Sequence, residues 1–256
     1  FGPLTWAALV AWQQDRGLVA DGVAGPATWL EMGQASSAPP VFLIEPLAGD
    51  ELALARRVSA ALAADHVPDP GGWANALAGP MLRAGITSQT RAAQFLANAS
   101  HETTGLTRLV EVLYYTTPAA MMRAWPRRFL TAEMCRPFLG QPLALAERVY
   151  GGRLGNGPEG SGDGWRFIGR GIPHITGRAN YTDEAARQRI PLDQLVAALE
   201  TRRGAAEAGC SWWVRNGLNE LADTGDTERV RRRVNGGLNG LDDVDRRLRR
   251  MPPALR

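Results

Sequence analysis

Cysteine, histidine and long hydrophobic runs are all scarce in this sequence. Its 256 residues include two cysteines and three histidines. Cys135 and Cys210 lie far apart and fit no metal-ligand spacing, so we expect buried free thiols, with one disulfide as the alternative. HExxH and CxxC motifs are absent, and we expect neither a metal nor another cofactor. No stretch approaches the roughly 20 apolar residues that cross a bilayer, so no membrane insertion is expected.

The chain also lacks a strong net charge of either sign. The net charge is +3, and arginines concentrate in residues 228–233 and 245–250, where acidic side chains interleave with them. The simpler interpretation is a solvated helix face, and the alternative is attraction to a polyanion such as nucleic acid or a bacterial wall. Because no DNA- or RNA-binding motif accompanies these runs, we expect no nucleic-acid partner.

The N-terminal segment carries a short internal repeat. The residues GPLTW at positions 2–6 recur as GPATW at positions 25–29, which marks two related helix starts. Phe1 opens the chain without an initiator Met or a leader, which indicates a truncated or processed start. Residues 34–50 are rich in Ala, Ser and Pro and indicate a linker.

The pattern FGPLTWAALVAWQQDRGLVADGVAGPATW resembles the peptidoglycan-binding domain that often accompanies wall hydrolases. The resemblance covers about the first 32 residues and lacks the first helical segment of that family. It implies a small helical module that binds peptidoglycan, and a helical extension packed on the next domain is the alternative. We therefore predict a partial peptidoglycan-binding domain at 1–33, a linker at 34–50 and a second domain at 51–256.

From Glu51 onward the hydrophobic pattern is mostly helical, and strand-like alternation is confined to short stretches near residues 167–175. This pattern predicts a mainly α domain with long loops. Helices are expected near residues 51–65, 88–103, 117–125, 142–150, 204–215, 226–234 and 241–249.

One predicted helix ends on an acidic residue. Thr87 is a suitable N-cap, and two threonines and Gly105 stop the helix just after Glu102. Because the helix dipole favours cations at this end, a carboxylate there mildly indicates function. Glu111 follows nine positions later, and on an unbroken helix about 900° of rotation would place the two carboxylates on opposite faces. They can share a site only if the helix breaks between them, a break that Gly105 is expected to provide, and paired carboxylates are what inverting glycosidases use.

Residues 150–171 are rich in glycine and also carry aromatic side chains and arginine. Glycine lets the backbone approach a ligand closely, and Tyr150, Trp165 and Phe167 are suited to stack on sugar rings. A phosphate-binding loop is excluded, because neither GxxxxGK[ST] nor a strand-borne GxGxxG is present.

Four segments together resemble glycoside hydrolase family 19, which comprises chitinases and related phage and bacterial endolysins. They are AAQFLANASHETTGLTRLVEVLYY, AERVYGGRLGN, GDGWRFIGRGIPHITGRANY and RRVNGGLNGLDD, and their order and spacing match over roughly residues 80–250. The endolysin branch is the nearer match, through the Glu102 to Glu111 spacing and the endings GRANY and NGGLNG. The resemblance implies a lysozyme-like helical catalytic domain.

The resemblance also implies roles for individual residues. Glu102 would be the general acid that protonates the glycosidic oxygen, and Glu111 the general base that activates water, with inversion at the anomeric carbon. The other implied site residues contact substrate or water. They are Thr176, which helps to hold the water, Asn180 and Asn235, and the cleft-lining Tyr114, Trp165 and Arg170, for each of which a structural role is the alternative.

His174 departs from the family pattern, because glutamine normally stands there and hydrogen-bonds sugar. Its two ring nitrogens can donate or accept, so we expect His174 to bind substrate in place of glutamine, with some sensitivity to pH. His101, beside the acid, is expected to be a packing or hydrogen-bonding residue and not a proton donor.

The leading hypothesis is a monomeric endolysin of the muramidase or lysozyme type, whose partner is bacterial cell-wall peptidoglycan. A chitinase and a non-catalytic wall-binding protein remain open, as does a lytic transglycosylase, which would use one carboxylate and no water. We expect the protein in a host cytoplasm, with delivery to the periplasm or wall, or secreted.

Overall fold

The computed structural model describes residues 9, 11–18, 28 and 49–252. Within this part of the chain the regular structure is helical, and β pairing is confined to isolated bridges of Arg170 with Val110 and with Ile175. The expected mainly α, lysozyme-like fold is confirmed. Residues 11–15 of the N-terminal segment are helical, whereas the predicted linker lies almost wholly outside the described residues.

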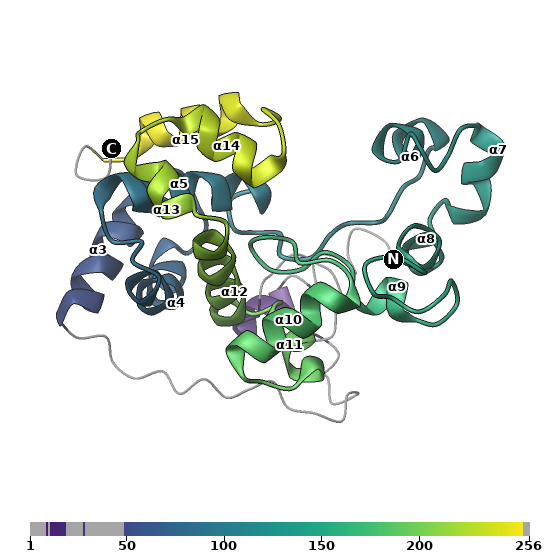
Figure 1. The fold of residues 1–256 in the computed structure, drawn as a ribbon, viewed down its shortest axis with the longest axis horizontal. Helices are drawn as coiled ribbons and strands as arrows, with labels where there is room; N and C mark the ends of the chain where they lie inside the picture. The colour runs from purple at the N-terminus through teal and green to yellow at the C-terminus, as the bar shows by residue number, and fades with distance from the viewer. Residues whose placement is uncertain (1–8, 10, 19–27, 29–48, 253–256) are drawn as a thin grey trace. The chain divides into compact units, whose positions relative to one another are not determined.

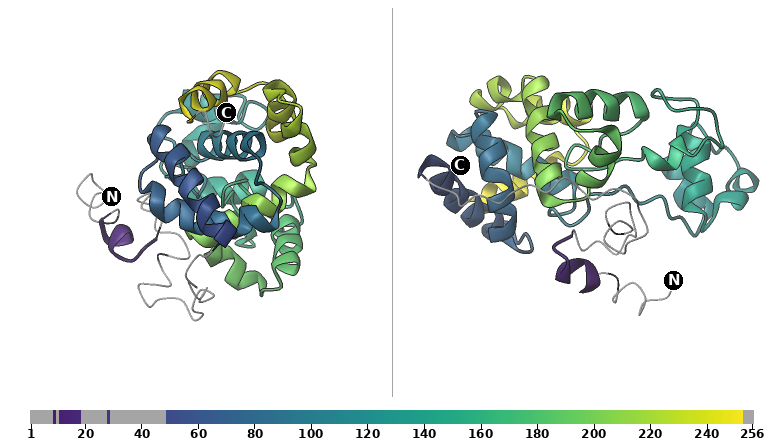
Figure 2. Two further views of the ribbon diagram at one scale, coloured as in Figure 1. Left: turned by 90° about the vertical axis from the view of Figure 1, so that its left-hand side faces the viewer. Right: turned by 90° about the horizontal axis from the view of Figure 1, so that it is seen from below.

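The chain forms two compact units, and the first is built from three separate stretches. It comprises Phe1–Leu109, Gly171–Pro173 and Ala197–Arg256. Its helices are α3 (Gly49–Ala64), α4 (Pro70–Arg83), α5 (Gln89–Glu102), α12 (Arg202–Arg215), α13 (Leu218–Asp223), α14 (Thr227–Asn235) and α15 (Leu241–Arg250). Helix α4 packs against α3 and α12, while α13, α14 and α15 pack around α5 (Figure 1). Figure 2 shows the blue early helices of this unit beside its yellow-green late ones.

The second unit comprises Val110–Arg170 and His174–Val196. Its helices are short: α6 (Pro118–Ala124), α7 (Ala132–Cys135), the 3-10 helix η1 (Arg136–Phe138), α8 (Pro142–Tyr150), α9 (Asp163–Arg166) and α10 (Arg178–Gln188). Helix α11 (Leu192–Ala198) carries the chain back into the first unit.

A continuous apolar core holds the first unit together. Buried side chains of α5 pack on α12, where Phe95 meets Trp213 edge to face with ring centroids 5.4 Å apart. The indole N–H of Trp213 donates to Asn219 over 3.0 Å, so the burial of this large residue leaves no unpaired donor. Helix α5 is therefore a fixed platform, and its last residue is Glu102.

Polar side chains hold the loops of the second unit. The buried carboxylate of Glu147 on α8 accepts hydrogen bonds from the backbone N–H groups of Gly160, Gly162 and Trp165. Asp163 pairs with Arg178, whose Nε lies 2.7 Å from Oδ2. Backbone N–H groups on long loops have no acceptor in a helix or sheet. These carboxylates accept or pair in place of such partners and so fix the loop conformation.

The expected helices are present, with small changes at their ends. Ser88 is the N-cap of α5, not Thr87, because the Ser88 hydroxyl accepts from the N–H of Arg91 while the Thr87 carbonyl accepts from Arg57. Helices α4 and α10 were not predicted, and neither were the shorter α7, η1, α9, α11 and α13. In α4, Pro80 stands inside the helix and glycines follow Pro70, which are helix-breaking signals that tertiary packing overrides.

Both cysteines are free and buried in the described part of the chain, which confirms the expected thiols. Burial raises the pKa of the Cys210 thiol well above its ordinary value. Of the helices described, none has the length and apolar character to span a membrane.

Candidate active site

Glu102 stands where α5 ends and the chain reverses. The hydroxyl of Thr103 donates to the carbonyl of Ala99 over 2.6 Å and accepts from the N–H of Leu106 over 3.0 Å. Thr104 and Gly105 then adopt positive φ angles of 53° and 73°. The threonine side chain thus satisfies backbone groups that the helix end leaves open, and it places the Glu102 side chain, 32 % exposed, at the surface of the first unit.

A buried arginine from α14 holds the Glu102 carboxylate. Arg231 is 0 % exposed, and its Nη1 lies 2.6 Å from Oε1 of Glu102 and 3.2 Å from Oδ1 of Asn98. Its Nε donates to the carbonyl of Asn239 over 2.6 Å. These bonds run from one rigid guanidinium to α5 and to the loop after α14, so they fix the position of the Glu102 carboxylate. Arg231 belongs to a basic run that was interpreted as a solvated face, and nothing in its sequence context indicated this role.

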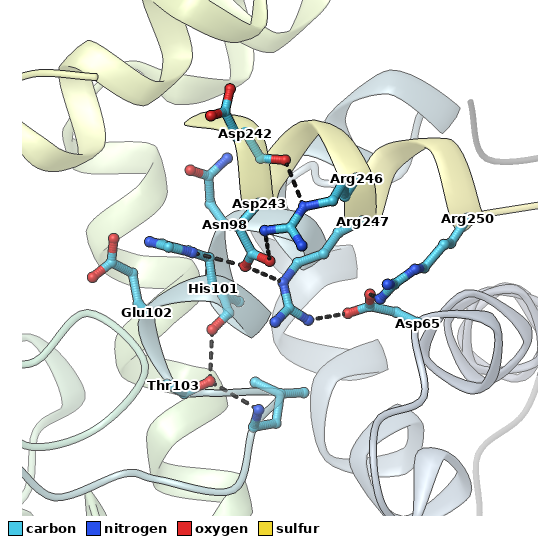
Figure 3. A network of polar contacts seen from close by, with 12 residues as sticks. Asp65, Asn98, His101, Glu102, Thr103, Asp242, Asp243, Arg246, Arg247 and Arg250 are labelled. Carbon is cyan, nitrogen blue, oxygen red and sulfur yellow. Dashed lines mark hydrogen bonds and ion pairs between the residues drawn. The ribbon is translucent and has the colours of Figure 1, made fainter. Parts of the chain in front are cut away.

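His101 ties the same helix end to α15 (Figure 3). Its Nδ1 lies 2.9 Å from Oδ2 of Asp243, which also accepts from Nε of Arg247 over 2.8 Å. Arg247 reaches on to the fully buried carboxylate of Asp65, with Nη1 2.5 Å from Oδ2. Gly240 allows this approach, because a Cβ there would lie 2.0 Å from Nε2 of His101. His101 is thus a hydrogen-bonding residue, as expected from the sequence.

The Asp243 network makes stability depend on pH. Burial alone would raise the pKa of Asp243, but hydrogen bonds from His101 and Arg247 lower that pKa from 3.8 to about 2. A carboxyl with a depressed pKa contributes its full stability above the unfolded value, and this contribution is lost as pH falls from about 4 to about 2. We expect Asp243→Asn to reduce the fall in thermal midpoint over this range, measured by circular dichroism. Asp242→Asn changes the exposed neighbouring residue and should leave the fall in thermal midpoint unchanged. Equal dependence of the midpoint on pH in the two variants would contradict the attribution to Asp243.

Glu111 is the centre of a separate cluster in the second unit. The Tyr150 hydroxyl lies 2.7 and 2.8 Å from its two carboxylate oxygens, and the N–H of Gly169 donates to Oε2 over 3.2 Å. The backbone N–H of Glu111 donates in turn to the carbonyl of Gly169 over 2.8 Å. Burial raises the pKa of Tyr150, and the negative charge of Glu111 raises it further, so the hydroxyl stays protonated and donates. Tyr150 therefore orients the carboxylate, whereas the sequence suggested a sugar-stacking ring.

Three predicted site residues meet at Gly169. A Cβ added there would lie 3.2 Å from Nδ1 of His174 and 3.3 Å from both Oγ1 of Thr176 and Cβ of Glu111. The Thr176 hydroxyl donates to the carbonyl of His174 over 3.0 Å, which leaves its oxygen lone pairs as acceptors. His174 is held at a φ of 48°, an uncommon value for a residue with a side chain. The structure thus brings Glu111, His174 and Thr176 around one small space.

Filling that space should impair the site. We expect Gly169→Ala to lower turnover about tenfold or more, because the methyl group must displace His174, Thr176 or Glu111 by a few tenths of an ångström. The measurement is the rate of hydrolysis of peptidoglycan, the substrate that the sequence resemblance predicts. Gly71→Ala is the matched control, since a Cβ there meets nothing within 4 Å. Equal rates for both variants would show that the space at Gly169 has no role.

The remaining predicted contacts differ in how they present their side chains. Asn180 is exposed and its Nδ2 donates to the carbonyl of Thr176 over 2.8 Å, while Tyr114 is 59 % exposed. Trp165 is partly buried, and its backbone is fixed by Glu147. Asn235 is the exposed last residue of α14 in the first unit. These four remain predicted substrate contacts.

Arg170 and Phe167 require correction. Arg170 is 1 % exposed, and its Nη1 donates to the carbonyl of Arg166 and to the Tyr181 hydroxyl over 2.8 and 3.2 Å. It therefore braces the loop and does not line a cleft. Phe167 is 0 % exposed and packs on Tyr181, so its ring cannot stack on a sugar. The glycine-rich sequence around both residues predicted side chains that a ligand could reach. Both side chains are instead buried in the small core of the second unit.

Two comparisons with known proteins found similarity to this chain. Residues 1–32 match the family described as "Putative peptidoglycan binding domain". Over 168 residues the chain is 33 % identical to the "Glycosyl hydrolase family 19 domain-containing protein" of Haemophilus influenzae, a match that covers 66 % of this chain and 82 % of that protein.

The chain belongs to glycoside hydrolase family 19.

This family 19 chain is therefore similar to a glycosyl hydrolase family 19 domain-containing protein over 66 % of its length, and its residues 1–32 match a putative peptidoglycan-binding domain. The two findings together support a cell-wall glycosidase. Within the described residues, no group of three His, Cys, Asp or Glu side chains is placed to hold a metal ion.

Proposed function

We propose that the protein is an endolysin of the muramidase or lysozyme type, which hydrolyses β-1,4 glycosidic bonds of bacterial peptidoglycan with inversion. The observation that carries the proposal is the combination of a family 19 region with an N-terminal peptidoglycan-binding match. A binding module raises the effective concentration of the enzyme at an insoluble wall, which favours peptidoglycan over chitin as the substrate.

Glu102 is the general acid in this proposal. A general acid must present its proton in one fixed direction to the leaving oxygen. The bond from Arg231 to one carboxylate oxygen of Glu102 supports this role, because it leaves the other oxygen available to carry the proton. The buried position of Arg231 keeps that arrangement rigid.

Glu111 is the general base that activates water. Its orientation by Tyr150 and Gly169 supports this role, as does the nearby Thr176 oxygen, which can accept a hydrogen bond. Two acceptors, Glu111 and Thr176, would hold both protons of one water and direct its lone pair toward the sugar. In an inverting enzyme that water attacks the anomeric carbon from the face opposite the leaving group.

The test is digestion of purified peptidoglycan, with the released fragments analysed by mass spectrometry and chitin oligomers assayed in parallel. Reducing-end muramic acid fragments that carry added water are the expected result. Anhydro ends would identify a lytic transglycosylase, and cleavage of chitin alone would identify a chitinase. Wall binding without release would leave a non-catalytic binding protein, and each of these outcomes would overturn the proposal.

A further inference from the structure

Residues 118–138 of the second unit carry positive charge that acidic residues do not balance. This segment runs from α6 through α7 to η1 and contains four arginines but only one acidic residue, Glu133. The arginines are Arg123, Arg127, Arg128 and Arg136. The net charge of the segment is therefore +3, which equals the net charge of the whole 256-residue chain. The excess positive charge of the protein is thus concentrated here, whereas the rest of the chain is neutral on balance.

These arginines have little to pair with inside the protein. The side chains of Arg123, Arg127 and Arg128 make no hydrogen bond or ion pair with any other described residue. Arg136 reaches Glu133 over 3.8 Å, but the two side chains are 72 % and 71 % exposed, and such a surface pair contributes little. Many arginines elsewhere in the chain hold carboxylates of the protein instead. The positive charge of this segment is therefore available to an external partner.

The same segment exposes apolar side chains. Leu130 is 69 % exposed, more than any other large apolar side chain of the described residues, and Met134 is 38 % exposed. Leu130 directly precedes Thr131, the N-cap of α7, whose hydroxyl oxygen accepts from the N–H of Met134 over 3.4 Å. An apolar residue at this position often packs back onto its own helix, but the exposure of Leu130 leaves most of its side chain in water. These two apolar groups therefore contribute little to the core and remain available, as the arginines do.

Buried residues hold this surface in place. Phe129 is buried, and its ring meets that of Phe138 edge to face with centroids 5.5 Å apart. The thiol of Cys135, also buried, donates to the carbonyl of Pro118 over 3.8 Å and so joins α7 to the start of α6. Helices α6 and α7 accordingly lie side by side (Figure 1). The exposed groups are thus presented from a packed support and not from a long loop.

The cationic and apolar groups also lie close together. Arg127 stands three positions before Leu130, so their Cα atoms are at most about 11 Å apart. A soluble polyanion such as nucleic acid would pair with the arginines but would give the leucine no apolar surroundings. An apolar groove of another protein would bury the leucine but would strip water from the arginines without replacing it. The interface of an anionic bilayer accepts both, because phosphates that suit guanidinium groups lie directly above its acyl chains.

We propose that residues 118–138 bind the surface of an anionic phospholipid bilayer. The arginines pair with headgroup phosphates, while Leu130 and Met134 enter the boundary between the headgroups and the acyl chains. The contact is peripheral. It does not depend on which bond the enzyme cuts, so it stands apart from the proposed function.

The experiment measures co-sedimentation of the 256-residue chain with vesicles of equal parts phosphatidylglycerol and phosphatidylcholine, and with vesicles of phosphatidylcholine alone. Binding is expected to the anionic vesicles only, and it should weaken as salt shortens the Debye length from about 10 Å at 0.1 M to about 3 Å at 1 M. The double variant Arg123→Gln with Arg127→Gln should weaken binding about thirtyfold, since each arginine near an anionic surface strengthens binding about fivefold. Leu130→Ser should weaken binding about tenfold, because one apolar side chain is lost from the interface.

Two control variants remove similar groups elsewhere. The double variant Arg187→Gln with Arg189→Gln changes two exposed arginines at the end of α10 in the same unit, and Val214→Ser changes an exposed apolar residue of α12. Both should bind anionic vesicles nearly as wild type does, and circular dichroism verifies that every variant is folded.

Three outcomes would overturn the proposal. The first is that wild type does not bind anionic vesicles. The second is that the two arginine double variants lose binding equally, because net charge and not residues 118–138 would then govern it. The third is that Leu130→Ser binds as wild type does, because the arginines would then recognise anions without the apolar part of the bilayer.

Discussion

Glu102→Gln and Glu111→Gln are each expected to lower the rate of peptidoglycan hydrolysis by about two to four orders of magnitude. Glutamine keeps the shape of the side chain but can neither give a proton to the leaving oxygen nor take one from water, and general acid–base catalysis contributes effects of this size. Each variant should retain the helical circular dichroism of wild type, because both carboxylates are partly exposed. The measurement is the initial rate of release of soluble fragments.

The matched control is Glu133→Gln, an exposed carboxylate of α7 in the second unit, which should leave the rate unchanged. The variants of Glu102 and Glu111 test two separate proposed roles. If Glu111→Gln kept its rate while Glu102→Gln lost it, a single carboxylate would suffice and water activation by Glu111 would be excluded.

Arg231→Met should lower turnover about a hundredfold and also destabilise the first unit. Methionine fills much of the same space but makes none of the bonds to Glu102, Asn98 and Asn239, so the Glu102 carboxylate loses its fixed position. Hydrogen bonds to charged groups contribute about 1.5–3 kcal/mol each, and because Glu102 is one-third exposed we expect a loss near 2–3 kcal/mol in total. Chemical denaturation and the rate of wall hydrolysis are the measurements.

The neighbouring Arg232 provides the control for Arg231. Its side chain is 59 % exposed and pairs only loosely with Glu228, 3.7 Å away, so Arg232→Met should change stability by no more than about 0.5 kcal/mol. Arg231→Lys should recover part of the activity, since lysine supplies the charge without the planar fork. If Arg231→Met changed turnover and stability no more than Arg232→Met does, Arg231 would have no role in positioning Glu102.

The sequence pattern predicted those parts of the fold that are set by residues close together in the chain. The end of α5 at Glu102 follows from threonine and glycine chemistry, and α5, α12 and α14 each begin after a residue whose side chain caps the helix. Helix α10 escaped prediction because its residues, Arg178–Gln188, are polar and carry only a weak apolar stripe. It is held instead by Tyr181 in the core of the second unit and by the pairing of Arg178 with Asp163.

The partners of the two carboxylates could not be predicted in the same way. Arg231 and Tyr150 lie 129 and 39 positions away from the glutamates they hold, and each resembles ordinary residues of its type in sequence. Arg231 is one of several arginines in a basic run, and only folding distinguishes the buried one from its exposed neighbours. Motif resemblance therefore identified the candidate acid and base, but not the side chains that orient them.

The long separation in sequence between Glu102 and Arg231 affects when the proposed acid can become ordered during synthesis. Glu102 emerges from the ribosome more than a hundred residues before Arg231, and His101 before Asp243, at the usual pace of about 5–20 residues per second. Until α14 and α15 have been synthesised and have docked on α5, the carboxylate of Glu102 lacks its bond to Arg231, and the neighbouring His101 lacks its bond to Asp243. A nascent chain or a fragment that ends before residue 227 therefore contains the HETTG motif without the contacts that orient the proposed acid.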